Sequence, residues 1–307
     1  MITRKHLRLD HAIRFSWKNI LFSTFCWALA FASTRITGWP RIEIPISIIT
    51  VLGTALAIIL AFRNSSAYER WWEARIIWGG LLNECRSFTR QIITFSDPTG
   101  PRNEDRALIL LLIGWVNALR LQMRQITDRP TWDRAVHVHL PSEISASLSS
   151  YNNAAVAIGM EIARRVKDMH SRELIGTLLF VQLDNTLTRL TDLQGRTERI
   201  RNTPLPRPYD YYTLAFLNIF ILFFPFGMIH QLQGDLMQLL LLPISVIVGW
   251  IFYQIYVFGK VLSHPFQNWR TDVPLDSITN TIEIDLKQIL GDRNVPSKLE
   301  PVNGVLM

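Results

Sequence analysis

The sequence predicts an all-α membrane protein with four transmembrane helices and a large cytosolic helical bundle. The 307 residues are 49% hydrophobic yet 19% charged, a mixture typical of a chain divided between lipid and water. Four stretches carry almost no charge. Between the second and the third of them, apolar residues recur at helical spacing. Together these three observations favour membrane helices joined to water-exposed helices.

The first apolar stretch, residues 20–34 within a span of about 20–36, is short, because a hydrocarbon core of about 30 Å needs about 20 residues. Lys18 and Arg35 flank it, and their long side chains can reach the membrane interface. The second stretch, residues 44–62, has no charged residue and is long enough to cross the core.

The third and fourth spans cover residues 211–230 and 236–259, and Pro243 inside the fourth predicts a kink or a local break in hydrogen bonding. No Asp, Glu, Lys or Arg lies inside the four apolar stretches. Proton-coupled transporters and intramembrane hydrolases need ionisable groups at such depth. The pattern therefore favours a passive pore over an enzyme or a pump.

Basic residues predict that both termini are cytosolic, because Lys and Arg collect in cytosolic segments beside membrane spans. Five precede the first span, whereas the loop after it carries two and the loop between the third and fourth spans carries none. Residues 20–62 and 209–259 are thus two transmembrane hairpins in a cell membrane, and residues 1–19, 63–208 and 260–307 are cytosolic. This topology explains the net charge of +7, so nucleic-acid binding is not expected.

The segment 63–208 is predicted to form several amphipathic helices rather than a loop. Apolar residues recur at helical spacing over residues 71–82, 107–121, 153–166 and 173–193. The helix that follows the second span is expected to continue that span into the cytosol, and residues 97–101, Asp-Pro-Thr-Gly-Pro, predict a turn.

Residues that could catalyse a reaction or hold a metal do not form a recognisable set, and no cofactor is expected. His137 and His139 would share a face in a strand, but without a third ligand we expect a solvated surface pair. Cys26 and Cys85 imply no disulfide framework. The acidic residues that a membrane-bound enzyme would use are scattered: Glu84, Glu104, Asp128, Asp133, Glu161 and Asp184.

The segment that closes the second span, residues 62–75, reads FRNSSAYERWWEAR. It closely resembles the signature of the bestrophin family in its prokaryotic branch. Residues 198–206, Pro265 with Phe266, and residues 272–283 resemble further family segments in the right order, so the likeness covers about residues 4–290. The signature residues are Arg63, Asn64, Tyr68, Arg70, Trp71, Trp72, Glu73 and Arg75.

Bestrophins are pentameric ion channels, so the resemblance implies a homopentamer in a lipid bilayer that passes monovalent ions through one central pore. It places Thr54, Ile58 and Phe62 at a narrow neck, where apolar rings close by excluding water. Their spacing lets one helix aim all three at an axis. Without the resemblance, Ile58 and Phe62 are better explained by packing against lipid or other helices. A cytosolic aperture maps to Leu178, for which a core leucine is the alternative.

Two departures from the family pattern bear on function. Thr54 stands where relatives often have a bulkier apolar residue, so its ring could hold water and shorten the dry gate. Residues 267–270, Gln-Asn-Trp-Arg, replace the acidic run of animal members. Because calcium takes about six to eight oxygen ligands, no calcium site is expected from Asp272 and Asp276 alone.

These features favour a passive channel for chloride or other monovalent anions. A sodium or potassium channel of the same architecture is the first alternative, because the neck carries no formal charge and selectivity must come from dehydration and the surrounding potential. A membrane-bound enzyme or a non-conducting scaffold would fit the sequence less well.

Overall fold

The computed structural model describes residues 1–2, 9–36, 44–95, 103–232 and 234–307. Within these residues the secondary structure is helical apart from two isolated bridges, Ile2–Val305 and Val302–Val305. The all-α prediction is confirmed for this part of the chain. The chain divides into two compact units: unit 1 comprises residues 1–3, 71–203 and 265–307, and unit 2 comprises residues 4–70 and 204–264.

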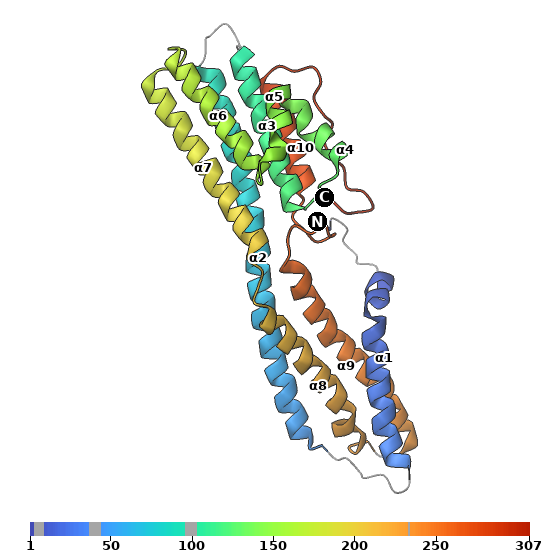
Figure 1. Cartoon of the computed structure of the whole chain (residues 1–307). Coiled ribbons are helices and arrows are strands. Elements are labelled where there is room, and N and C mark those ends of the chain that lie inside the picture. Colours follow the sequence, from blue (N-terminus) through green and yellow to red (C-terminus); the bar gives the residue numbers. More distant parts are fainter. Residues whose placement is uncertain (3–8, 37–43, 96–102, 233) are drawn as a thin grey trace. The chain divides into compact units, whose positions relative to one another are not determined.

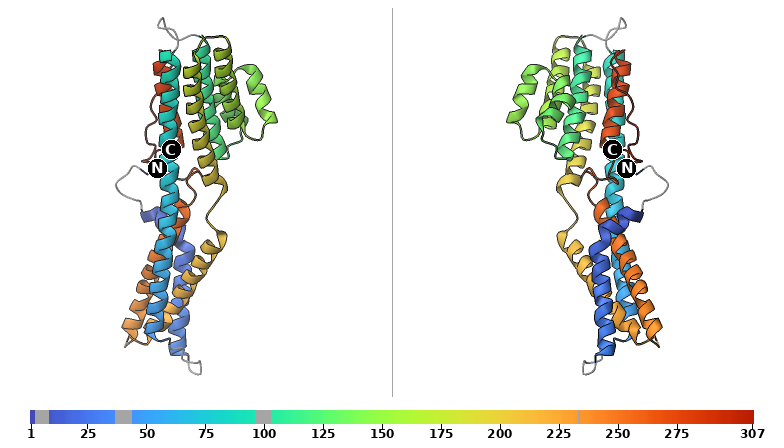
Figure 2. Two further views of the ribbon diagram at one scale, coloured as in Figure 1. Left: turned by 90° about the vertical axis from the view of Figure 1, so that its left-hand side faces the viewer. Right: turned by 90° about the vertical axis from the view of Figure 1, so that its right-hand side faces the viewer.

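Unit 2 holds the helices that correspond to the predicted spans (Figure 1). They are α1 (Leu9–Arg35), the first part of α2 (Ile46–Phe95), α8 (Arg207–Ile229) and α9 (Asp235–Leu262). α1, α8 and α9 pack against one another, and Figure 2 shows from two further sides that these three helices and the first part of α2 form one bundle. α2 joins them through a cluster of buried side chains: Cys26, Ile49, Leu56, Leu60, Leu217, Phe220, Ile221 and Tyr256.

Three of the four predicted spans lie in helices long and apolar enough to cross a membrane, namely α2, α8 and α9. The same criteria do not select α1, whose apolar stretch is short. They select instead α3 (Asn103–Met123), although 72% of its apolar segment is buried inside the protein, against 17% for α9. Unit 1 itself therefore covers the apolar surface of α3, whereas α9 leaves most of its own apolar surface exposed.

α2 is a single helix of 50 residues. As predicted, the second span continues as a helix beyond Arg63, and no proline interrupts its hydrogen bonding. At about 1.5 Å per residue its length is about 75 Å, which exceeds twice the thickness of a hydrocarbon core. The turn predicted at residues 97–101 lies outside the described residues, as do the basic residues within 4–8 and Arg41.

Unit 1 is a helical bundle around a large apolar core. α3 packs against α6 (Ala154–Ser171), α7 (Thr177–Asn202) and α10 (Leu275–Ile289), and the second part of α2 adds large buried side chains to the core, among them Trp78 and Phe88. α6 buries one stripe at helical spacing: Ala155, Ile158, Ile162, Val166 and Met169. The bundle thus follows the periodicity on which its prediction rested.

Four short helices connect α3 to α6. They are α4 (Arg129–Ala135), η1 (His137–His139), α5 (Ser142–Ser147) and η2 (Leu148–Ser150). Asp128 caps α4, because its carboxylate accepts the backbone N–H of Thr131 at 3.0 Å.

The two histidines of this connection correct a prediction. They lie in the 3₁₀-helix η1 rather than in a strand, and His139 is not a solvated surface residue. Its side chain is 7% exposed, with Nε2 3.8 Å from a carboxylate oxygen of Glu283. The neighbouring side chains of Val136 and Leu140 join the apolar core and carry His139 inwards. Burial lowers the pKa of His139 below the usual histidine value.

Candidate functional site

Thr54, Ile58 and Phe62 lie on one exposed stripe of α2. Ile58 and Phe62 are 52% and 67% exposed, and Thr54 is exposed as well. Successive residues of a helix differ by about 100°, so positions i, i+4 and i+8 span only about 80° around the axis. The opposite side of α2 is buried, through Leu56 and Leu60. The helix therefore presents the three predicted neck residues on a face that the chain itself leaves uncovered.

The hydroxyl of Thr54 is turned back on its own helix. Its Oγ1 donates to the carbonyl of Thr50 at 2.8 Å, a bond common for threonine within helices. The hydroxyl proton is therefore already bound, and the oxygen remains as an acceptor beside the methyl group. A ring of Thr54 side chains would be less polar than a ring of free hydroxyl groups.

Arg63 follows Phe62 directly and points to the buried side of α2. It is 3% exposed, and its guanidinium donates to the carbonyl of Tyr256 on α9 at 2.8 Å. It forms an ion pair with Asp210 on α8 and lies 4.5 Å from the centre of the Tyr256 ring. The hydroxyl of Tyr256 also donates to the Asp210 carboxylate at 3.2 Å. These contacts offset the cost of burying the arginine charge.

Asp210 and Tyr256 were not predicted as partners of Arg63. A signal for the first was available, because Asp210 is an acid directly before an apolar stretch of the length of a span. Such an acid needs a cation or water near the membrane boundary, and Arg63 stands at the corresponding end of another span. No comparable signal marks Tyr256, whose carbonyl and ring act together.

Asn64 and Arg70 also bind the backbone of α9. Asn64 Nδ2 donates to the carbonyl of Ile255 at 3.0 Å, and Arg70 Nε donates to the carbonyl of Ser263 at 2.8 Å. Ser263 caps the end of α9, where carbonyls lack helical partners. A Cβ at Gly259 would lie 1.9 Å from Asn64 Oδ1, so this close approach requires glycine. The signature thus supplies side-chain donors that hold α2 against α9.

The remaining signature residues have mixed surroundings. Tyr68 and Trp72 are about half exposed, at 51% and 48%, and Arg75 is partly buried. In unit 1, Trp71 Nε1 donates to the carbonyl of Thr271 at 2.9 Å, and Glu73 accepts from Arg199 at 2.6 Å. The signature is therefore a set of separate structural contacts rather than one binding constellation.

Leu178 lies in the first turn of α7 and is 88% exposed. The buried stripe of α7 is formed by other residues, among them Leu183 and Leu190. Leu178 is therefore not a core leucine of unit 1, which removes the alternative weighed against its place at an aperture.

The acidic residues considered for an enzyme do not converge in the part of the chain that the structure describes. No group of three or more His, Cys, Asp or Glu residues there could hold a metal ion. Most of the candidates are engaged in ion pairs: Glu84 with Arg189, Glu104 with Arg172, Asp133 with Arg129, and Glu161 with Arg164 and Arg165.

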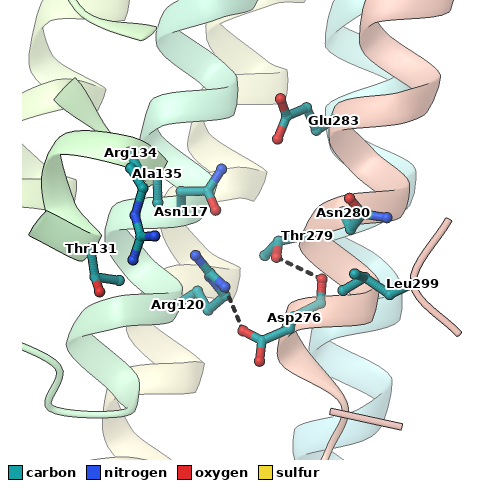
Figure 3. A pocket seen from close by; sticks show the side chains of 10 residues that line it. All are labelled: Asn117, Arg120, Thr131, Arg134, Ala135, Asp276, Thr279, Asn280, Glu283 and Leu299. Carbon is teal, nitrogen blue, oxygen red and sulfur yellow. Dashed lines mark hydrogen bonds and ion pairs between the residues drawn. The ribbon is translucent and has the colours of Figure 1, made fainter. Parts of the chain in front are cut away.

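A polar pocket of about 300 Å³ lies in unit 1 between α3, α4 and α10 (Figure 3). Arg120 of α3 reaches across it to an ion pair with Asp276 of α10. On the same wall, Glu283 pairs with Lys287 at 2.7 Å. Pairs such as Arg120 with Asp276 tie α10 to α3, so the pocket has a structural explanation.

Known proteins resemble the chain over most of its length. The family described as bacterial and fungal bestrophin protein matches residues 12–288. The voltage-dependent anion channel-forming protein YneE of Salmonella typhi is 30% identical over 82% of this chain and 79% of its own. A voltage-dependent anion channel-forming protein of Ralstonia nicotianae is 28% identical over 95% of each chain.

Solved structures share the fold. The crystal structure of a bacterial bestrophin homolog from Klebsiella pneumoniae has a TM-score of 0.80 at 24% identity, over 90% of this chain and 98% of that one. The crystal structure of a single-substitution variant of that homolog, with one tryptophan replaced by alanine, has a TM-score of 0.81 at 24% identity, over 94% of this chain and the whole of that one. At this level of identity the likeness concerns the fold alone.

Proposed function

Because the chain belongs to the bacterial and fungal bestrophin family, we propose that it is the pore-forming subunit of a passive channel for chloride and other monovalent anions. The resemblance carried by residues 62–75 is thereby confirmed, and the family identifies a membrane protein rather than an enzyme. The relatives named above are described as anion channel-forming proteins. Their names support anions over cations.

The observation that carries the proposal is the exposed apolar stripe of α2 opposite an anchored, buried face. In a homopentamer with the five stripes turned to one axis, Thr54, Ile58 and Phe62 form successive rings. Residues four apart rise by about 6 Å along a helix, so the neck is about 12 Å long. The Ile58 and Phe62 rings cannot hydrate an ion, and a constriction of this kind closes by losing water.

In this proposal part of the chain lies in the bilayer and the rest lies in the cytosol. The exposed apolar faces of α8 and α9 contact lipid in a cell membrane. Residues 1–19, 63–208 and 260–307 are cytosolic, as the distribution of basic residues predicts. Leu178, exposed at the start of α7, forms a second aperture on the cytosolic path of the ion.

The test is electrical. Purified protein in planar bilayers should pass current with a reversal potential close to that of chloride under a KCl gradient. The variants I58A and F62A should increase this current, because a smaller side chain widens the dry constriction and admits water. The matched control is I247A, since Ile247 is a 55% exposed apolar residue of α9 on a face assigned to lipid.

Three results would change the conclusion. A reversal potential close to that of potassium would keep the pore and favour the cation alternative. Equal currents in I58A, F62A and I247A would show that Ile58 and Phe62 do not form the neck. A folded oligomer that passes no current would favour the scaffold. Native mass spectrometry should give a pentamer.

A further inference from the structure

The three charged residues of the segment 63–70, Arg63, Glu69 and Arg70, lie on two different sides of α2. Arg63 is buried against α8 and α9, and Arg70 Nε is bound to the carbonyl of Ser263. Glu69, the third charge, is exposed. Its carboxylate accepts a hydrogen bond from Ser65 Oγ at 3.4 Å, one turn earlier on the same helix. The two positive groups therefore serve contacts within unit 2, and the negative group remains on the open side.

Glu69 lies on the stripe that carries the neck residues. It follows Ile58 by eleven positions, which at about 100° per residue is three turns plus about 20°. Thr54 and Phe62 lie about 40° to either side of Ile58, so Glu69 falls between their directions. The seven residues from Phe62 to Glu69 rise by about 10 Å. The continuous helix α2 thus carries the apolar stripe directly onto a carboxylate.

We infer that Glu69 is a specificity-determining residue of the channel. This inference rests on the proposed function, because a homopentamer turns five Glu69 side chains into a carboxylate ring at the inner mouth of the neck. Such a ring concentrates cations and depletes anions around it. Anions therefore cross the inner mouth against the field of the Glu69 ring. Residues in or beyond the neck supply the preference for anions.

The ring lies close enough to act on ions in the neck. The Debye length is about 30 Å at 0.01 M salt, about 8 Å at 0.15 M and about 3 Å at 1 M. A separation of about 10 Å from Phe62 is thus well within reach at low salt and screened at high salt. Removing the charges should raise the chloride-to-potassium permeability ratio about three- to tenfold at 0.01 M, and hardly at all at 1 M.

The experiment compares reversal potentials of wild type, E69Q and E69K in planar bilayers under a KCl gradient centred on about 10 mM. E69Q should shift the reversal potential towards that of chloride, and E69K should shift it further. The matched control is E143Q, because Glu143 is also exposed but lies on α5 in unit 1. It should behave as wild type.

A cysteine variant tests the charge within one and the same channel. Cys26 and Cys85 are both fully buried, and burial raises the pKa of the Cys85 thiol, which leaves little reactive thiolate. In E69C, a negatively charged methanethiosulfonate reagent should therefore restore the selectivity of wild type. A positively charged reagent should reproduce that of E69K.

Equal reversal potentials in wild type, E69Q and E69K at low salt would overturn the inference and leave the channel proposal intact. The same holds if both reagents leave the selectivity of E69C unchanged after mass spectrometry has shown that they reacted. A folded wild-type oligomer without any current would instead overturn the proposed function, and this inference with it.

Discussion

α3 and α9 are both apolar and long enough to cross a membrane, yet the protein covers only one of them. α3 has 72% of its apolar segment buried, against 17% in α9. α9 packs on α1 and α8 and leaves an apolar stripe at helical spacing exposed: Leu236, Leu240, Ile244, Ile247, Ile251, Ile255 and Phe258. Apolarity thus indicates that a helix must be covered, and only packing tells whether protein covers it.

The positions of the charged residues explain why the sequence predicts a membrane span for α9 and a cytosolic helix for α3. α9 has its charged residues at its ends, Asp235 and Lys260, so its whole apolar length can lie in lipid. α3 begins with Glu104 and Asp105 and carries Arg120 near its other end, where Arg120 pairs with Asp276 across a pocket.

The largest effect should come from the ion pair that neutralises the buried Arg63 of unit 2, whose partner Asp210 is 41% exposed. D210N leaves the buried guanidinium of Arg63 without its carboxylate partner and should lower the stability of the protein in detergent by about 3–5 kcal/mol. R35M removes a similar pair with Asp235, but those side chains are 43% and 78% exposed, so about 1 kcal/mol or less is expected. Chemical unfolding followed by tryptophan fluorescence measures both. Equal losses would contradict the anchoring role of Arg63.

The direct comparison of α3 with α9 uses one substitution at two sites. Leu112 of α3 is fully buried, so L112A should cost about 2–5 kcal/mol through lost contacts and a cavity. Leu240 of α9 is 46% exposed, and L240A should cost less than about 1 kcal/mol, because detergent or lipid fills the space. A large loss in L240A would show that another protein surface covers α9.

A buried carboxylate gives unit 1 a dependence on pH. Burial raises the pKa of Asp272 to about 6, above its value of about 3.9 in an unfolded chain. The fold therefore favours the protonated form, and this contribution is fully present below about pH 4 and lost as the pH rises through about 6.

D272N should remove this dependence. At pH 8 we expect the variant to be more stable than wild type by about 2–3 kcal/mol. Asparagine can still accept the N–H of Trp269, which Asp272 accepts at 3.1 Å. Thermal unfolding of both proteins between pH 4 and 8 tests this, and parallel curves would show that Asp272 stays charged in the fold.

Two helical glycines should respond in opposite directions to alanine. G259A places a Cβ against Asn64 and should cost about 1–3 kcal/mol. Gly195 of α7 has nothing within 4 Å of an added Cβ, so G195A should stabilise by about 0.5–1 kcal/mol. The difference in melting temperature between the two variants is the readout. A neutral G259A would mean that Asn64 moves aside at no cost.

The sequence predicted the parts of the fold that depend on local pattern. The apolar stretches at 44–62, 211–230 and 236–259 became α2, α8 and α9, and α2 continued beyond Arg63 because no residue there breaks a helix. The stretch at 20–34 is weaker by itself, and α1 packs on α8 and α9, contacts that its own residues do not reveal.

Long-range contacts were not predictable from pattern. Arg63 and Asp210 are 147 positions apart, so only the packing of α2 on α8 makes them a pair. His139 was expected in water, but its side chain is buried beside Glu283, because the neighbouring Val136 and Leu140 belong to the apolar core. The spacing of Thr54, Ile58 and Phe62 predicts a shared face, whereas their role in a neck stays a prediction that the electrical experiments test.

The anchoring of Arg63 limits how a gate on α2 can open. Phe62 and Arg63 are adjacent, so turning the helix about its axis to remove Phe62 from the pore would also pull Arg63 away from Asp210 and Tyr256. That motion would leave the buried guanidinium of Arg63 without its carboxylate partner in each subunit. The neck should therefore widen without rotation of α2 about its own axis. It would proceed by changes in the rotamers of Ile58 and Phe62, or by an outward tilt of α2, α8 and α9 as one body.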